Sequence, residues 1–344
     1  EIVNGFYMRN AHLPARVLAE HSETAYMTRR AIDFIRDAGD EPWSLHLSYI
    51  KPHWPYMVPS PYHNIYGVED VLPAVRNDDE RADPHPVVKA FMNHGEGVVL
   101  SDDSARHNVI PTYMGLVKEL DDHVGHLMTA LSDLGRSDDT LIVLTSDHGD
   151  YLGDHWLGEK ELFHEPSVRI PLIVADPSMS AEQSRGSTSR ALVEGIDLIP
   201  TFIDVLGGNP HQPWLEGRSF LDILHGRSAE SRDFVVAELD YFARKARLEL
   251  KVAADRAKGW MVRSDRWKYV FYEGFEPQLF DLDNDPDELT DRASDPSCQG
   301  VLDEHRDRLF HWFRCRKSTV TVDYDYLDTR HEFATRGGFI FGEW

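Results

Sequence analysis

An aspartate and a histidine stand side by side in the run Thr145-Ser146-Asp147-His148-Gly149-Asp150. The run follows four aliphatic residues, 141–144, which predict a strand buried on both faces inside a parallel sheet. In open α/β sheets, ligands bind at the carboxyl ends of the strands. An oxygen ligand beside a nitrogen ligand suits one half of a transition-metal site. Taken alone, however, the dipeptide is better explained as a helix N-cap formed by Asp147 or Asp150.

The residues that follow favour the metal site. The segment from Asp147 to Pro171 resembles the second metal-binding motif of the sulfatase branch of the alkaline phosphatase superfamily. The matching residues are Asp147-His148-Gly149-Asp150, Gly153-Asp154-His155, Lys160 and Glu165-Pro166-Ser167-Val168-Arg169-Ile170-Pro171. Within that family the chain most resembles the phosphonate monoester hydrolases, which share the segment Lys51-Pro52-His53-Trp54-Pro55-Tyr56. The resemblance covers essentially all 344 residues.

The resemblance implies roles for four side chains. Asp147 and His148 would be metal ligands, and His53 and Lys160 would bind the oxygens of the ester and assist its leaving group. These roles suit the hydrolysis of phosphate, phosphonate or sulfate esters, which needs a Lewis acid, an in-line nucleophile and a proton donor. His155 is ambiguous, because it could support the metal ligands or be a satisfied helix histidine.

The ligand types and the net charge narrow the cofactor and the partners. An aspartate with a histidine suits a divalent ion of manganese, zinc or iron better than calcium, which prefers oxygen ligands but stays possible. Lys+Arg 36 against Asp+Glu 59 gives a net charge of −23, which argues against nucleic acid or an anionic membrane as partner. We expect a small anionic ester as substrate, attracted by the metal and by local cations.

The nucleophile of the family has no counterpart in the sequence. The family uses a cysteine or serine in the motif Cys/Ser-x-Pro-x-Arg, matured to formylglycine. Cys298 and Cys315 do not stand in such a motif, and no serine does. The first metal-ligand aspartate of the family is missing as well. We therefore expect no nucleophile in this chain and interpret it as an N-terminally truncated fragment of an enzyme.

Three functions follow from this interpretation. The close likeness to phosphonate monoester hydrolases favours hydrolysis of phosphonate monoesters and phosphodiesters through a formylglycine-type nucleophile outside the chain. A sulfuric ester hydrolase, similar to arylsulfatases or choline sulfatases, is the alternative within the family. A truncated metal-binding relative without turnover is the alternative of another class.

The pattern of apolar residues predicts an α/β fold. Helices are expected over 24–38 and from Pro111 to Gly135, and strands over 43–50, 141–144, 171–175 and 234–238. Residues 62–104 lack a sustained period and predict a long surface excursion with short helices. The resemblance implies an alkaline-phosphatase-like α/β/α sandwich with its N-terminal part missing. From Gly259 onward, short strands predict a smaller antiparallel sheet covered by a helix over 301–313.

These patterns predict three regions and a location. Residues 1–258 form a partial catalytic domain, and residues 259–317 form the antiparallel subdomain with its helix. The aromatic tail, 318–344, packs on its own domain or on a neighbouring subunit, so we expect a homo-oligomer. Two cysteines in 344 residues indicate a reducing compartment, and no apolar run is long enough to span a membrane. We expect a cytoplasmic protein.

Overall fold

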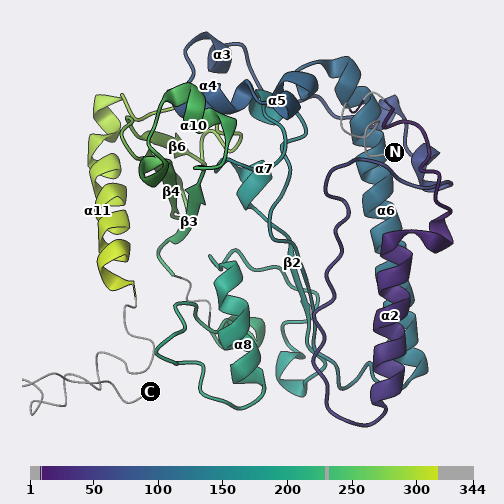
Figure 1. The fold of residues 1–344 in the computed structure, drawn as a ribbon. Coiled ribbons are helices and arrows are strands. Elements are labelled where there is room, and N and C mark those ends of the chain that lie inside the picture. Colours follow the sequence, from purple (N-terminus) through teal and green to yellow (C-terminus); the bar gives the residue numbers. More distant parts are fainter. Residues whose placement is uncertain (1–7, 9, 229–231, 317–344) are drawn as a thin grey trace, which may run out of the picture. The chain divides into compact units, whose positions relative to one another are not determined.

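The structure is a computed structural model that describes residue 8, residues 10–228 and residues 232–316. The chain divides into two compact units (Figure 1). The first comprises Glu1–Ser178 and Leu239–Lys258, and the second comprises Met179–Glu238 and Gly259–Trp344. The three regions predicted from the sequence stay a prediction, and the tail 318–344 lies outside the described residues.

Two long helices frame the first unit. Helix α2, Glu23–Ala38, begins after Ser22, whose Oγ accepts a hydrogen bond from the Ala25 N–H. Helix α6, Asp103–Asp133, runs beside α2 (Figure 1). The predicted start of α6 at Pro111 is wrong. The helix begins earlier because Asp102 caps it, accepting a hydrogen bond of 2.9 Å from the Ser104 N–H.

Short helices make up much of the remaining first unit, as predicted for the excursion over 62–104. The α-helices are α3 (Asp79–Ala82), α4 (Pro86–Met92), α5 (Gly95–Leu100), α7 (Glu165–Val168) and α10 (Lys245–Leu250). The 3-10 helices are η1 (Ala19–His21), η2 (Tyr62–Asn64), η3 (Val68–Asp70), η4 (Asp154–Trp156) and η7 (Ala254–Arg256).

The metal motif follows the predicted strand, but the pairing and the burial of that strand differ from the prediction. Strand β1, Ile142–Thr145, pairs with β2, Leu172–Ala175, and the pairing is antiparallel. The strands are half-buried to exposed, and Ile173 is 63% exposed. The prediction of a parallel sheet with strands buried on both faces is therefore wrong here. A run of aliphatic residues indicates an apolar strand, but it does not indicate which strands pair with it or in which direction.

The segment 43–50 is extended without being a paired strand. Its residues alternate between half-buried and exposed, as the sequence predicted, but it pairs with no strand among the described residues. Its inner face contacts α2. The rings of Trp43 and Phe34 meet edge-on at 6.3 Å, and the hydroxyls of Tyr49 and Thr28 are hydrogen-bonded at 2.8 Å. The strand prediction is wrong in pairing and right in the alternation of faces.

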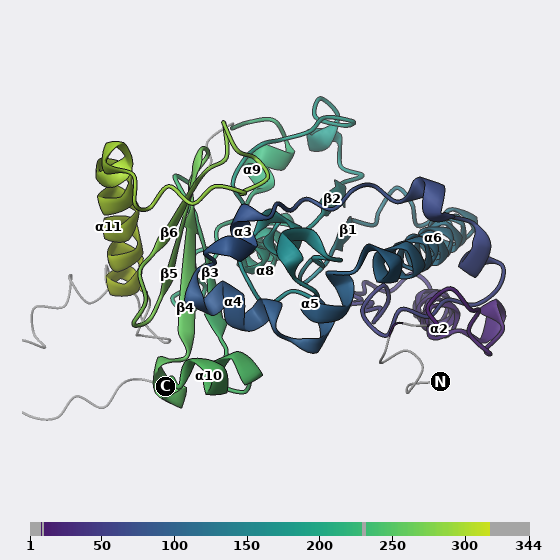
Figure 2. The ribbon, with the colours of Figure 1, turned by 90° about the horizontal axis from the view of Figure 1, so that it is seen from above.

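The second unit contains most of a four-stranded sheet in the order β3-β4-β5-β6. The strands are β3 (Val235–Asp240), β4 (Lys258–Arg263), β5 (Trp267–Tyr272) and β6 (Gln278–Asp281). The pairs β4–β5 and β5–β6 are antiparallel. Helix α11, Gln299–Cys315, packs against this sheet (Figure 2). The predicted C-terminal sheet with a covering helix is confirmed.

The second unit contains a buried ion pair. Lys268 on β5 lies 2.6 Å from Glu288, Nζ to Oε1, and both side chains are at most 1% exposed.

The remaining helices of this unit are α8 (Leu198–Val205), α9 (Leu221–Leu224), η5 (Met179–Ala181), η6 (Gly195–Asp197) and η8 (Pro296–Cys298). Among all described residues, no helix combines the length and the apolar composition needed to cross a membrane.

Candidate active site

His53 lies in the proline-rich loop that follows the extended segment 43–50. Its Nδ1 lies 2.7 Å from the carbonyl oxygen of Trp54. Because a carbonyl only accepts, Nδ1 carries the proton and Nε2 presents a lone pair. Lys160 occupies that side, with Nζ 2.5 Å from Nε2. The loop thus turns the ring of His53 so that its unprotonated nitrogen faces an ammonium group.

Lys51 braces the same loop from its start. Its Nζ donates to the carbonyl oxygens of His53 at 3.2 Å and of Pro55 at 2.5 Å. Burial lowers the pKa of the Lys51 ammonium group. The two carbonyl contacts hold the main chain on both sides of the histidine.

Asp147 and His148 follow β1 directly. The Nδ1 of His148 lies 2.7 Å from the carbonyl oxygen of Gly149, so this ring also carries its proton on Nδ1. Its Nε2 lies 3.7 Å from Oδ2 of Asp147, whose side chain is 89% exposed. The rings of His148 and His53 meet edge-on at 5.5 Å. Four of the five predicted site residues therefore lie in one place.

Lys160 is positioned by a folded loop. The Tyr151 N–H donates to the carbonyl of Glu159 at 2.8 Å, which closes the loop between them. Ser167 Oγ donates to the carbonyl of Lys160 at 2.6 Å. The loop after β1 and helix α7 also approach closely, and a Cβ on Gly149 would collide with the backbone of Pro166. Only glycine fits there, which explains the glycine after His148.

The structure places His155 in a separate buried cluster. Its ring stacks on His164 at 4.1 Å, and its Nδ1 lies 2.7 Å from Oε1 of Glu80 on α3. The Tyr151 hydroxyl lies 2.9 Å from Nδ1 of His164. Because Glu159 and Tyr151 are hydrogen-bonded, this cluster supports the loop that carries Lys160. The contacts of His155 are those of a packing residue of that loop.

The side chains of Asp150 and Tyr56 form a contact in the site that the sequence did not predict. The Tyr56 hydroxyl donates to Oδ2 of Asp150 at 2.6 Å. Burial raises the pKa of Asp150 to about 6, against the hydrogen bonds from Tyr56 and from the Leu152 N–H. Burial also raises the pKa of Tyr56 above its ordinary value. Both residues stand inside the motifs singled out above, but nothing in the sequence pairs them.

Two side chains fit as metal ligands. Asp147 offers an exposed carboxylate, and His148 offers an unprotonated Nε2 beside it. A metal-binding histidine ordinarily donates its other ring N–H to a carbonyl or carboxylate, as His148 does to Gly149. The described residues contain no group of three or more histidine, cysteine, aspartate or glutamate side chains placed to hold one ion. They therefore fit as part of a metal site.

Two family models match the chain. The model described as "Sulfatase" matches residues 4–208, and the model described as "N-sulphoglucosamine sulphohydrolase, C-terminal" matches residues 153–314. The first covers more than half of the chain and contains His53, Asp147, His148 and Lys160.

Individual relatives agree with the family models. The multifunctional alkaline phosphatase superfamily protein PehA of Trinickia caryophylli is 31% identical, over 87% of this chain and 61% of that protein. The choline-sulfatase of Rhizobium meliloti (strain 1021) is also 31% identical, over 84% of this chain and 55% of that protein. The chain thus spans less than two thirds of the length of these curated relatives.

Solved structures give the same fold. The phosphonate monoester hydrolase SpPMH from Silicibacter pomeroyi superposes with a TM-score of 0.82 at 27% identity, covering 92% of this chain and 65% of that one. The phosphonate monoester hydrolase of Agrobacterium radiobacter superposes with a TM-score of 0.79 at 26% identity, covering 88% and 65%.

Proposed function

Because the chain belongs to the sulfatase family of the alkaline phosphatase superfamily, we propose that it serves the metal-dependent hydrolysis of phosphonate monoesters and phosphodiesters. The observation that carries the proposal is the approach of Lys160 Nζ to His53 Nε2 beside the Asp147–His148 pair. The likeness to two phosphonate monoester hydrolases supports the substrate class.

Each side chain has a role in this proposal. Asp147 and His148 hold a divalent metal through a carboxylate oxygen and Nε2, and nitrogen with oxygen favours manganese, zinc or iron over calcium. The bound metal supplies Lewis-acid neutralisation of the charged oxygens of the ester. Lys160 binds an ester oxygen through an N–H of its ammonium group, and His53 orients that group through the lone pair on Nε2. A proton on Nζ is then placed for transfer to the leaving group. The attacking group is a formylglycine-type nucleophile outside these 344 residues.

A second substrate class has its own support. Curated relatives bear the names choline-sulfatase and arylsulfatase, the latter from Clostridium perfringens at 26% identity. Sulfate esters resemble phosphonate monoesters in presenting charged oxygens around a tetrahedral centre. The same four side chains would then bind a sulfuric ester.

The test is hydrolysis of p-nitrophenyl phenylphosphonate and of p-nitrophenyl sulfate with added manganese. We expect no turnover by this chain alone and turnover by a longer product of the same gene, with the phosphonate preferred. A preference for the sulfate would select the sulfatase alternative. Activity of the chain alone would contradict the external nucleophile, and inactivity of every product would favour a non-catalytic relative.

A further inference from the structure

A hydrogen bond between Tyr56 and Asp150 joins two loops of the candidate site that are distant in the sequence. Tyr56 and Asp150 lie 94 positions apart in the sequence, and the phenol oxygen lies 2.6 Å from the carboxylate oxygen. Tyr56 stands three residues after His53, and Asp150 stands two residues after His148. The bond therefore connects the loop that carries His53 to the loop that carries the proposed metal ligands.

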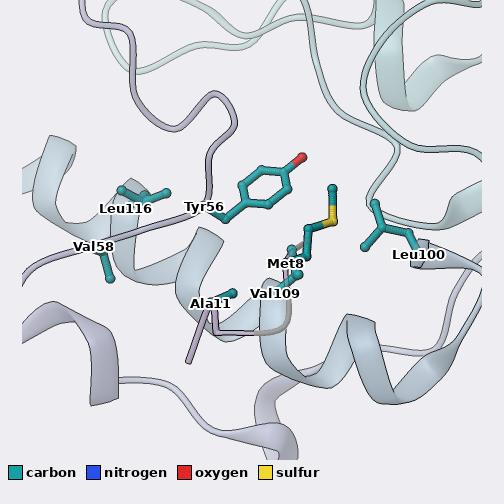
Figure 3. Packing of buried hydrophobic residues seen from close by; sticks show 7 residues of the cluster. All are labelled: Met8, Ala11, Tyr56, Val58, Leu100, Val109 and Leu116. Atoms are coloured by element: carbon teal, nitrogen blue, oxygen red, sulfur yellow. The ribbon is translucent and has the colours of Figure 1, made fainter. Parts of the chain in front are cut away.

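The tyrosine is fixed on one side of this bond. Its side chain is 1% exposed and belongs to the apolar cluster of Met8, Ala11, Tyr56, Val58, Leu100, Val109 and Leu116. Figure 3 shows its ring within this cluster and its hydroxyl pointing away from the side chains of Val58 and Leu116. The ring also meets that of Tyr113 edge-on at 6.1 Å. The hydroxyl is thus presented from a rigid base.

The carboxylate is fixed on the other side. Oδ2 of Asp150 accepts from Tyr56, and Oδ1 accepts from the Leu152 N–H at 3.1 Å. Each oxygen accepts one of these two bonds, so the carboxyl group cannot turn without losing a hydrogen bond. The turn 147–150, which carries His148, is therefore tied to the apolar cluster through Tyr56.

We propose that Tyr56 and Asp150 are positioning residues that set the spacing between the ring of His53 and the ring of His148. The proposal rests on the proposed function for its catalytic consequence, but the spacing itself is a property of the chain. The edge-on contact of the two rings at 5.5 Å is the geometry that the bond maintains. Lys51 holds the main chain of this loop at His53 and Pro55, and the bond from Tyr56 ties the loop to the turn that carries His148.

The test is nuclear magnetic resonance of the imidazole nitrogens in the full chain labelled with ¹⁵N-histidine. The variants are Tyr56→Phe, which removes one hydroxyl, and Asp150→Asn, which removes the charge. The control is Tyr113→Phe, which removes a hydroxyl from the neighbouring ring and leaves the bond intact. Signals of His53 and His148 are assigned with His53→Gln and His148→Gln.

We expect Tyr56→Phe and Asp150→Asn to shift the ring signals of both His53 and His148, and Tyr113→Phe to shift neither. Added Mn²⁺, bound at Asp147 and His148, should broaden the ring signals of both His53 and His148 in the unmodified chain. In Tyr56→Phe it should broaden the signal of His53 less. Broadening falls steeply with distance from the ion. If Tyr56 only stabilised the fold and did not set the spacing of the two rings, the ratio of the His53 broadening to the His148 broadening would not change. In an active longer product, Tyr56→Phe should lower kcat about 100-fold with little change in KM.

Ring signals of His53 and His148 that stay unmoved in both bond-breaking variants would overturn the proposal, as would equal shifts in Tyr113→Phe. Asp150→Asn answers the question if Tyr56→Phe does not fold. Failure of Mn²⁺ to broaden any ring in the unmodified chain would count against the proposed metal ligands instead. The metal-free shifts would still decide between a positioning bond and none.

Discussion

The C-terminal sheet and the candidate active site are assembled in opposite ways. Strands β4, β5 and β6 follow one another along the chain and pair as neighbours. The candidate site instead joins His53 to Lys160 across 107 positions and Tyr56 to Asp150 across 94. Local pairing makes the sheet, whereas long-range polar contacts between loops make the site.

The buried polar groups of the two regions differ as well. In the second unit, Lys268 and Glu288 face each other and are closed off from solvent. In the site, the carboxylate of Asp147 is exposed and Nε2 of His148 presents a lone pair. The first arrangement stabilises the fold, because each charge has its partner. The arrangement in the candidate site keeps the ligand atoms of Asp147 and His148 available, and the surrounding loops hold these two side chains in place.

The largest effect should follow from removal of a metal ligand. We expect His148→Ala or Asp147→Asn to lower Mn²⁺ affinity more than about 100-fold, beyond the range for residues that only support ligands. The measurement is Mn²⁺-induced broadening of the remaining histidine signals. His126→Ala, an exposed histidine on α6, is the control. Undiminished broadening in both ligand variants would remove the basis of the metal assignment.

Breaking the closed pair should destabilise the second unit and leave the site intact. Glu288→Gln leaves the Lys268 ammonium group buried without its counter-charge, and such losses cost ~3–5 kcal/mol. The free energy of unfolding in urea measures this, with the exposed neighbour Asp287→Asn as control. Mn²⁺ binding by the folded protein should not change. A cost equal to that of the control would mean that the pair does not stabilise the fold.

Loss of the site's ammonium group should act on turnover alone. Lys160→Ala removes the donor that faces His53 Nε2, and we expect kcat to fall about 10²- to 10³-fold in an active product. Metal binding and the free energy of unfolding should stay unchanged. The exposed Lys89→Ala on α4 is the matched control. If both variants hydrolyse the ester equally well, Lys160 has no part in leaving-group departure.

The smallest effect concerns an ion pair in the second unit between a half-exposed arginine and a buried aspartate. Hydrogen bonds from Arg266 hold the pKa of Asp281 well below its ordinary value. A carboxylate with a depressed pKa stabilises the fold above its unfolded pKa of about 3.9, and this stabilisation is lost as pH falls further.

Because Arg266 is 47% exposed, we expect Asp281→Asn to cost under about 1 kcal/mol at pH 7. The difference from the unmodified chain should become smaller at pH 3, where part of this stabilisation is already lost. Unfolding in urea at pH 7 and at pH 3 measures both values. A difference that grows on acidification would contradict the direction of the pKa shift.

The sequence predicted the parts of the fold that depend on local patterns. The C-terminal strands and α11 were predicted because their apolar periods and turns are local. The start of α6 differs from the prediction because both Asp102, as a cap, and Pro111, as a first helical residue, are compatible with a helix start, and the helix begins at the first of them. The pairing of β1 was missed because the partner strand is a property of the assembled sheet.

The site divides in the same manner. The motifs brought His53, Asp147, His148 and Lys160 to attention, and the structure places them together. No sequence pattern joins Tyr56 to Asp150, because their contact depends on how two loops meet after folding. The role of His155 is ambiguous in the sequence for the same reason, since its partner Glu80 comes from a distant segment.

Both site histidines donate Nδ1–H to the main-chain carbonyl of the next residue, Trp54 or Gly149. Every amino acid carries a carbonyl, so no single substitution at the accepting position deletes the acceptor. Where a carboxylate orients a catalytic histidine, by contrast, one mutation can remove it. The path of the backbone therefore determines the tautomer of both histidines, and substitutions of the surrounding side chains that keep this path leave the tautomer unchanged.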